Sequence, residues 1–236
     1  MAIELGLIRI LQVFVFQLFI GLFFLYLSYR ILKKNRSRLN ITFSLFYIFP
    51  AVGLLLNVVY SLIDIESVVV TLNFLTNFCI SFGVIFLYCT NKILLESQMV
   101  FSKKDQLKVV LIYAGLFALM AILYPFGQGV TINEGTEWKP VWELPLLIYV
   151  FILLSIALIL ILSTSIKIIK QFKDDTLRKK WRFFIIGVVG LFIYMFGAYL
   201  SNYVNQPAFR TGFSLFGLTV ILWIYLIYYG IGRQIE

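Results

Sequence analysis

Polar side chains inside apolar segments are the first candidates for chemistry in this sequence. Asn73, Asn77 and Ser81 recur every four residues within one such segment, which places them on one face of a helix. Amide and hydroxyl groups between helices can donate and accept hydrogen bonds with a small ligand. The same groups can instead hydrogen-bond between helices and hold a bundle together, at roughly 0.6–2 kcal/mol each. Both interpretations remain open from the sequence.

Other polar candidates lie near the ends of apolar segments. Tyr199 and Asn202 end one segment, and Trp138 lies in a polar loop at 126–142 with two glutamates. Long loops often carry function, although a plain interfacial lid is an alternative. We expect Trp138, Tyr199 and Asn202 to join the stripe above as a ligand-binding set. Further uncharged polar residues within apolar segments are Gln12, Gln17, Asn57 and Tyr203.

The residue types exclude most catalytic chemistry. The chain has no histidine, so histidine-based metal sites, general bases and catalytic triads are absent. We also expect no charged residue in the membrane interior, which argues against proton-coupled transport. Cys79 and Cys89 are separated by about 15 Å of helix, too far for a disulfide. We therefore predict no catalytic residue, no metal, no cofactor and no enzymatic activity.

The elements that must position these residues are membrane-spanning helices. Hydrophobic residues make up 61% of the chain and charged residues only 13%, whereas soluble domains carry about 25% charged residues. Seven apolar segments are long enough to cross about 30 Å of hydrocarbon, and backbone groups in lipid must be satisfied within helices. They are 7–30, 42–62, 69–91, 108–125, 144–166, 183–204 and 212–232. We predict an all-α membrane protein, a single seven-transmembrane helix bundle over residues 1–236.

The basic residues predict how the bundle faces. Most of the 20 lysines and arginines fall in the first, third and fifth connections, at 30–38, 92–108 and 167–182. Because Lys and Arg accumulate on the cytoplasmic side, we predict the N-terminus outside and the C-terminus cytoplasmic, in a multi-pass protein of the cell membrane. This topology explains the net charge of +9 without a nucleic-acid partner.

The fifth connection is the most basic. We expect it to contact a cytoplasmic partner or anionic lipid, although orientation alone also explains its charge. The candidate contact residues are Lys170, Lys173, Arg178, Lys179, Lys180 and Arg182.

Local signals refine the helices. Ser102 with Asp105 predicts a capping motif before the fourth span, and Asp174 with Asp175 predicts a cap before the sixth. Tryptophans at span ends, Trp142 and Trp181 among them, favour the headgroup level. Three glycines of the sixth span predict close approach of a neighbouring helix. They are Gly187, Gly190 and Gly197.

The last two spans resemble a known family. The run from Leu177 to Gly187 places Arg178, Lys179, Lys180 and Arg182 ahead of aliphatic residues, and the last span begins with Phe213-Ser214-Leu215-Phe216-Gly217-Leu218. Both are similar to the seven-transmembrane sensor region found at the N-terminus of some prokaryotic histidine kinases. The resemblance implies a sensor that signals from an outer site. Gly187 and Gly190 stand where that family suggests proline, and the sequence ends at Glu236, where a kinase domain would begin.

The first functional hypothesis is therefore a non-enzymatic membrane sensor or receptor-like protein. It would bind a small ligand from the outer side and signal through the basic cytoplasmic connections to a partner. The alternatives are a small-molecule transporter or channel subunit, and a membrane scaffold subunit.

Overall fold

Seven helical stretches long and apolar enough to cross a membrane run through the chain in a computed structural model, which describes residues 10–124 and 129–232. The described part confirms the seven predicted segments and the multi-pass helical class. The chain ends and the first residues of the 126–142 loop lie outside the described part. The stretches are Leu11–Lys34, Arg38–Tyr60, Glu66–Glu96, Lys103–Leu123, Leu144–Gln171, Asp175–Val204 and Pro207–Ile231, here called spans 1 to 7.

Several spans consist of more than one helical element. Span 1 is the π-helical η1 (Leu11–Gln17) and α2 (Leu18–Lys34), and span 2 is α3 (Arg38–Tyr60). Span 3 is α4 (Glu66–Gly83) and α5 (Ile85–Val100), and span 4 is α6 (Lys103–Ala118) and α7 (Met120–Leu123). Span 5 is α8 (Leu144–Gln171), and span 6 is α9 (Asp175–Val204). Span 7 is α10 (Pro207–Phe216), η3 (Gly217–Thr219), α11 (Val220–Ile227) and η4 (Tyr228–Gly232).

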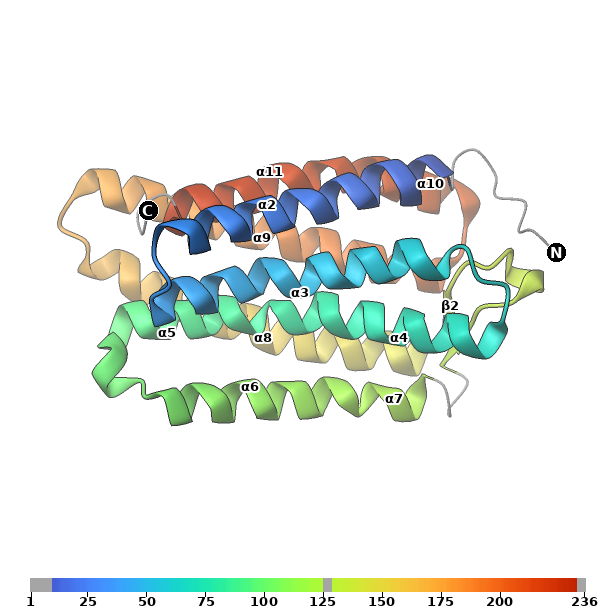
Figure 1. Ribbon diagram of the computed structural model, residues 1–236, viewed down its shortest axis with the longest axis horizontal. Coiled ribbons are helices and arrows are strands. Elements are labelled where there is room, and N and C mark those ends of the chain that lie inside the picture. Colours follow the sequence, from blue (N-terminus) through green and yellow to red (C-terminus); the bar gives the residue numbers. More distant parts are fainter. Residues whose placement is uncertain (1–9, 125–128, 233–236) are drawn as a thin grey trace.

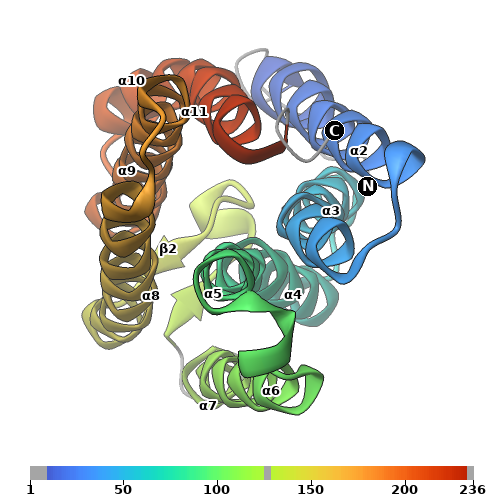
Figure 2. The same cartoon turned by 90° about the vertical axis from the view of Figure 1, so that its left-hand side faces the viewer.

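Successive spans run in opposite directions, so the connections alternate between two ends (Figure 1). One end, here called the hairpin end, carries an antiparallel pair, β1 (Val130–Thr131) and β2 (Val141–Trp142), with the short η2 (Glu134–Thr136) between them. The opposite end, here called the basic end, holds all three predicted basic connections. Along the bundle axis, α3 packs between α2 and α4, α9 packs on α8 and α11, and α6 lies at the periphery (Figure 2).

Side-chain caps determine where two of the spans begin, as predicted. Ser102 Oγ accepts a hydrogen bond from the Asp105 amide at 3.2 Å, and Asp174 Oδ1 accepts one from the Thr176 amide at 2.7 Å. Helix α9 therefore starts eight residues earlier than the apolar run suggested. The prediction of a loop over 167–182 is wrong, because only residues 172–174 separate α8 from α9.

The tryptophans of span ends point inward rather than toward lipid headgroups. Trp142 and Trp181 are both buried, and Trp181 Nε1 donates to the Ser165 carbonyl on α8 at 3.1 Å. Both rings therefore pack within the bundle and expose almost no surface to lipid. Hydropathy locates a helix end, but the face that a ring takes depends on the neighbouring helix.

Close packing of spans 6 and 7 depends on glycine, as predicted. A Cβ built on Gly187 would lie 2.7 Å from the Trp223 carbonyl oxygen, and one on Gly190 or Gly197 would overlap the Trp223 or Phe213 ring. Small residues let helix backbones approach closely in a membrane. Span 7 therefore sits against span 6 through a glycine-lined face.

Gly190→Ala is expected to destabilise the bundle by about 1–3 kcal/mol, because the Trp223 ring must move to admit a methyl group. Gly115→Ala is the matched control, since nothing lies within 4 Å of its Cβ position and alanine favours a helix by up to about 1 kcal/mol. Thermal unfolding of both variants in the same detergent measures the difference. Equal melting temperatures for the two variants would contradict this account of the packing.

Candidate functional site

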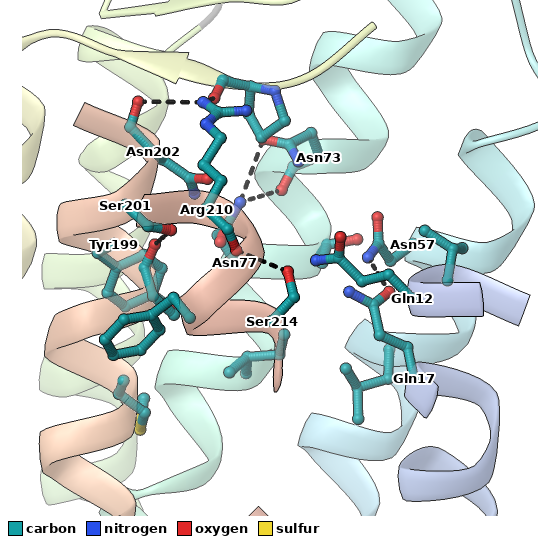
Figure 3. Close-up of a pocket in the computed structure, with 18 of the residues that line it drawn as sticks. Gln12, Gln17, Asn57, Asn73, Asn77, Tyr199, Ser201, Asn202, Arg210 and Ser214 are labelled. Atoms are coloured by element: carbon teal, nitrogen blue, oxygen red, sulfur yellow. Dashed lines mark hydrogen bonds between the residues drawn. The ribbon is translucent and has the colours of Figure 1, made fainter. Parts of the chain in front are cut away.

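A cavity of about 910 Å³ lies between spans 1, 2, 3, 6 and 7, and its lining runs from residues 137–140 beside β2 to Phe24 within α2. Five of the six candidate ligand-binding residues line it. They are Asn73, Asn77, Trp138, Tyr199 and Asn202. Gln12, Gln17 and Asn57 face them from spans 1 and 2 (Figure 3). The structure thus gathers the predicted polar residues around one space, and their role in binding stays a prediction.

Asn73 is the centre of a buried hydrogen-bond network. Its Nδ2 donates to Tyr60 Oη at 2.6 Å, and its Oδ1 accepts from Tyr124 Oη. Asn77 Nδ2 donates to Tyr124 Oη at 2.8 Å and to the Asn73 carbonyl oxygen at 2.8 Å. These bonds join spans 2, 3 and 4. Part of the polar stripe therefore holds helices together, as the structural alternative proposed.

Ser81 lies behind the cavity wall rather than in it. Its Oγ is 2.7 Å from Tyr199 Oη, and both side chains are buried. The Tyr199 ring stacks on Trp142 with the centroids 4.8 Å apart. Ser81 and Trp142 thus fix the orientation of a ring that faces the cavity.

Arg210 is a cavity residue that the sequence analysis missed. Its Nη2 donates to the carbonyl oxygens of Pro140, at 2.5 Å, and of Asn202, at 3.4 Å. Its Nε is buried and has no hydrogen-bond partner in the described part of the chain. The predicted span 7 began at residue 212, which left Arg210 in a loop. Pro207 was the available signal, because proline favours the first turn of a helix, and α10 begins at Pro207.

Thr76 is a second missed residue of the lining. Its side chain is only 4% exposed, and its Oγ1 has no hydrogen-bond partner among the described residues. A buried hydroxyl without a partner costs roughly 1–3 kcal/mol. Thr76 lies one position before Asn77 and hence off the four-residue stripe that the sequence analysis followed.

The deeper part of the cavity is apolar. Its lining there includes Phe24, Phe46, Ile80, Val84, Leu191, Met195 and Val220. The polar residues gather nearer the hairpin end. The cavity therefore has a polar entrance region and an apolar floor, here defined by those seven residues.

Helix irregularities gather at this floor. Pro50 lies within α3, Val84 separates α4 from α5, and the 3-10 turn Gly217–Thr219 separates α10 from α11. Pro50 and Gly83 pack together closely, since a Cβ on Gly83 would lie 2.6 Å from Pro50 Cδ. Irregular backbone at membrane depth is tolerated where it lines a cavity or is buried in protein.

The hairpin supplies a further side of the entrance region. Glu137 and Trp138 take left-handed backbone angles, with φ of 51° and 56°, which cost of order 1–3 kcal/mol each in non-glycine residues. Asn133 caps η2 through the Thr136 amide, and its carbonyl accepts from the Trp138 amide at 2.9 Å. The turn is thereby held in the strained form that directs Trp138 to the cavity.

The candidate contact residues at the basic end lie at the opposite end of the bundle. Lys170, Lys173, Lys179 and Arg182 are exposed. Arg178 pairs with Asp175 at 2.9 Å and also donates to the Phe172 carbonyl oxygen. Lys180 is half-buried on the same helix, α9. The cluster spans the short link between spans 5 and 6.

In comparisons with known proteins, no family model matches this chain, and no curated protein or solved structure matches it significantly. Among residues 10–124 and 129–232, no group of three or more His, Cys, Asp or Glu side chains could hold a metal ion. Function is therefore inferred from the cavity and the basic end.

Asn73→Leu is expected to destabilise the bundle by about 1–3 kcal/mol, because Tyr60 and Tyr124 lose a buried partner. Thr76→Val is the matched control from the same helix, since the Thr76 hydroxyl has no partner to lose. We expect its stability to be unchanged or slightly raised. Thermal unfolding of both variants in the same detergent measures their stabilities. A larger loss of stability for Thr76→Val than for Asn73→Leu would contradict the assignment of Asn73 to the hydrogen-bond network and of Thr76 to the cavity lining.

Proposed function

We propose that this protein is a non-enzymatic membrane sensor that binds a small ligand in the cavity and signals to a partner at the basic end. The observation that carries the proposal is the cavity itself, about 910 Å³ with a polar entrance and an apolar floor. Ligand sites of about 300–1,000 Å³ typically combine apolar walls with a few placed polar groups. The sensor-family resemblance of spans 6 and 7 supports the same function.

Ligand binding would reach the basic end through the irregular helices. The floor is bordered by Pro50, Val84 and the Gly217–Thr219 turn, which belong to three spans. Breaks of this kind let the two halves of a helix take different angles, whereas continuous helices move as rods. A ligand that prefers one angle shifts the population of both ends. The exposed bases of α8 and α9 then change their spacing toward an acidic partner or anionic lipid.

The proposal includes an orientation. The basic end faces the cytoplasm, in line with the preference of Lys and Arg for that side, and the hairpin end faces outward. The cavity is then reached from outside the cell. The protein resides in the cell membrane.

A transporter is the second candidate, because discontinuous helices around a site near mid-membrane also occur in carriers. Phe46 of the floor packs with Phe43 and Tyr47 in a buried aromatic cluster, so transport requires this cluster to open. A scaffold that holds a partner helix on the glycines of span 6 is not favoured, since Gly187, Gly190 and Gly197 pack against span 7 of the same chain.

Single-cysteine labelling tests the orientation. In a Cys79→Ser, Cys89→Ala background, a membrane-impermeant maleimide added to intact cells should label Lys139→Cys and spare Lys173→Cys. We expect this difference because the two positions lie at opposite ends of the bundle. Inverted vesicles should reverse the pattern. Labelling of Lys173→Cys on intact cells would overturn the orientation.

A tethered adduct tests the sensor without a known ligand. Thr76→Cys in the same background should react with a membrane-impermeant methanethiosulfonate from outside only, because its side chain lines the cavity. Benzyl methanethiosulfonate should then fill the cavity and alter amide hydrogen exchange at the α8–α9 link. Ser81→Cys is the control, since Ser81 lies outside the lining and should stay unreactive.

Two results would decide against the sensor. Labelling of Thr76→Cys from both sides of the membrane would favour the transporter, since a carrier opens its site alternately. A filled cavity with unchanged exchange at residues 170–182 would contradict coupling to the basic end.

A further inference from the structure

Charge in the cavity lining is unbalanced. Its charged residues within the described part of the chain are Glu137, Lys139 and Arg210. Glu137 and Lys139 form an ion pair with each other. Arg210 bonds to backbone carbonyl oxygens and pairs with no carboxylate within residues 10–124 and 129–232. Among the described residues, the lining therefore carries one net positive charge, located in the first turn of α10.

The guanidinium of Arg210 retains donors for a ligand. Its two hydrogen bonds both come from Nη2, while Nε is buried without a partner in the described chain. A guanidinium presents five N–H donors in a planar fork that matches carboxylate and phosphate oxygens. A half-buried cation is partly withdrawn from water and has no anion in the described chain, so an anionic group arriving here gains both charge balance and hydrogen bonds.

Thr76 provides an independent sign that the cavity receives a ligand. Thr76 belongs to the same lining and is only 4% exposed, and its enclosed hydroxyl lacks a partner among the described residues. Helical threonines usually satisfy this hydroxyl on the carbonyl four residues earlier. Two residues of one lining, on spans 3 and 7, thus each hold an enclosed polar atom without a partner in the described chain.

The apolar floor indicates the rest of the ligand. Phe24, Phe46, Val84, Leu191 and Val220 surround the deep part of the cavity. A ligand that carries only an acid group would leave these surfaces facing water or empty space. An apolar chain buried there gains roughly 0.8 kcal/mol for each methylene group removed from water.

We propose that the ligand is an anionic amphiphile, with its acidic head on Arg210 and its apolar chain against the floor. This inference rests on the proposed function, because it names the ligand class of the same cavity. A carboxylate and a phosphate head share the required chemistry, and the head can belong to a free amphiphile or to a bilayer lipid.

Photoaffinity labelling tests the ligand class. Dodecanoate and 1-dodecanol, each with a diazirine near the chain end, are added to the protein in phosphatidylcholine nanodiscs, and labelled residues are mapped by mass spectrometry. We expect dodecanoate to label the floor residues in preference to dodecanol. Unlabelled dodecyl phosphate should compete. Phosphatidylglycerol placed in the nanodisc identifies a bilayer-lipid source if it competes, and a free-amphiphile source if it does not.

Variants isolate the charge. Arg210→Gln should weaken dodecanoate binding about 10- to 100-fold, the value of a charge-assisted hydrogen bond, and leave dodecanol labelling of the floor unchanged. Lys108→Gln removes an exposed base at the basic end and should change neither probe. Arg210→Lys keeps the charge and should keep the preference for the carboxylate.

The outcomes separate this inference from the proposed function. Equal labelling of the floor by both probes, unaffected by Arg210→Gln, would overturn the anionic ligand and leave a ligand cavity in place. Absence of labelling at any lining residue with either probe would contradict the cavity's function as well. If Arg210→Gln loses both probes, Arg210→Lys decides, and loss of its carboxylate preference overturns the inference.

Discussion

A bilayer supplies no hydrogen bonds, so each polar group within it needs a partner in the protein, and this constraint organises the whole bundle. In the basic half, Asn91 Nδ2 donates to the Ile161 carbonyl oxygen at 3.1 Å and to Ser165 Oγ at 2.8 Å, and this amide joins spans 3 and 5. Near the hairpin end, Asn73 joins spans 2, 3 and 4 in the same way. Polar side chains thus connect the spans through hydrogen bonds. A buried polar group without a partner lowers the stability of the folded protein.

Unpartnered buried polar atoms occur at several places in the described chain, but those of Thr76 and Arg210 line the cavity. Tyr47 and Tyr113 also bury a hydroxyl without a partner, and neither lines it. A missing partner in a tightly packed region is a local cost, whereas an enclosed atom on a residue of the cavity lining gains a partner when a molecule enters and the side chain turns toward it. The unpartnered atoms of Thr76 and Arg210 therefore favour the binding of a polar ligand in the cavity.

The spans could be predicted from the sequence because apolar segments of this length are stable in the hydrocarbon of a bilayer. The sequence could not predict which neighbouring helices each span contacts. Asn73, Asn77 and Ser81 share a helical face as expected, yet their partners Tyr60, Tyr124 and Tyr199 come from three other spans. Helix starts shifted for a similar reason, since polar caps such as Asp174 extend helices beyond the apolar run. Arg210 was missed because a charged residue near the end of an apolar segment is typical of a loop. The start of α10 at Pro207 places it in a helix instead.

The position of Arg210 also bears on how binding could become a signal. Its guanidinium joins three elements, since it lies on α10 and donates to Pro140 beside the hairpin and to Asn202 on α9. An anion that binds the remaining donors draws the guanidinium toward itself, which distorts the two Nη2 bonds and so loosens the hairpin and α9 from α10. A tenfold shift between two arrangements needs a difference of about 1.4 kcal/mol in ligand affinity, and one charge-assisted hydrogen bond provides roughly that much. On the ligand class proposed above, a single contact at the entrance is thus strong enough to bias span 7, whose break at Gly217–Thr219 borders the floor.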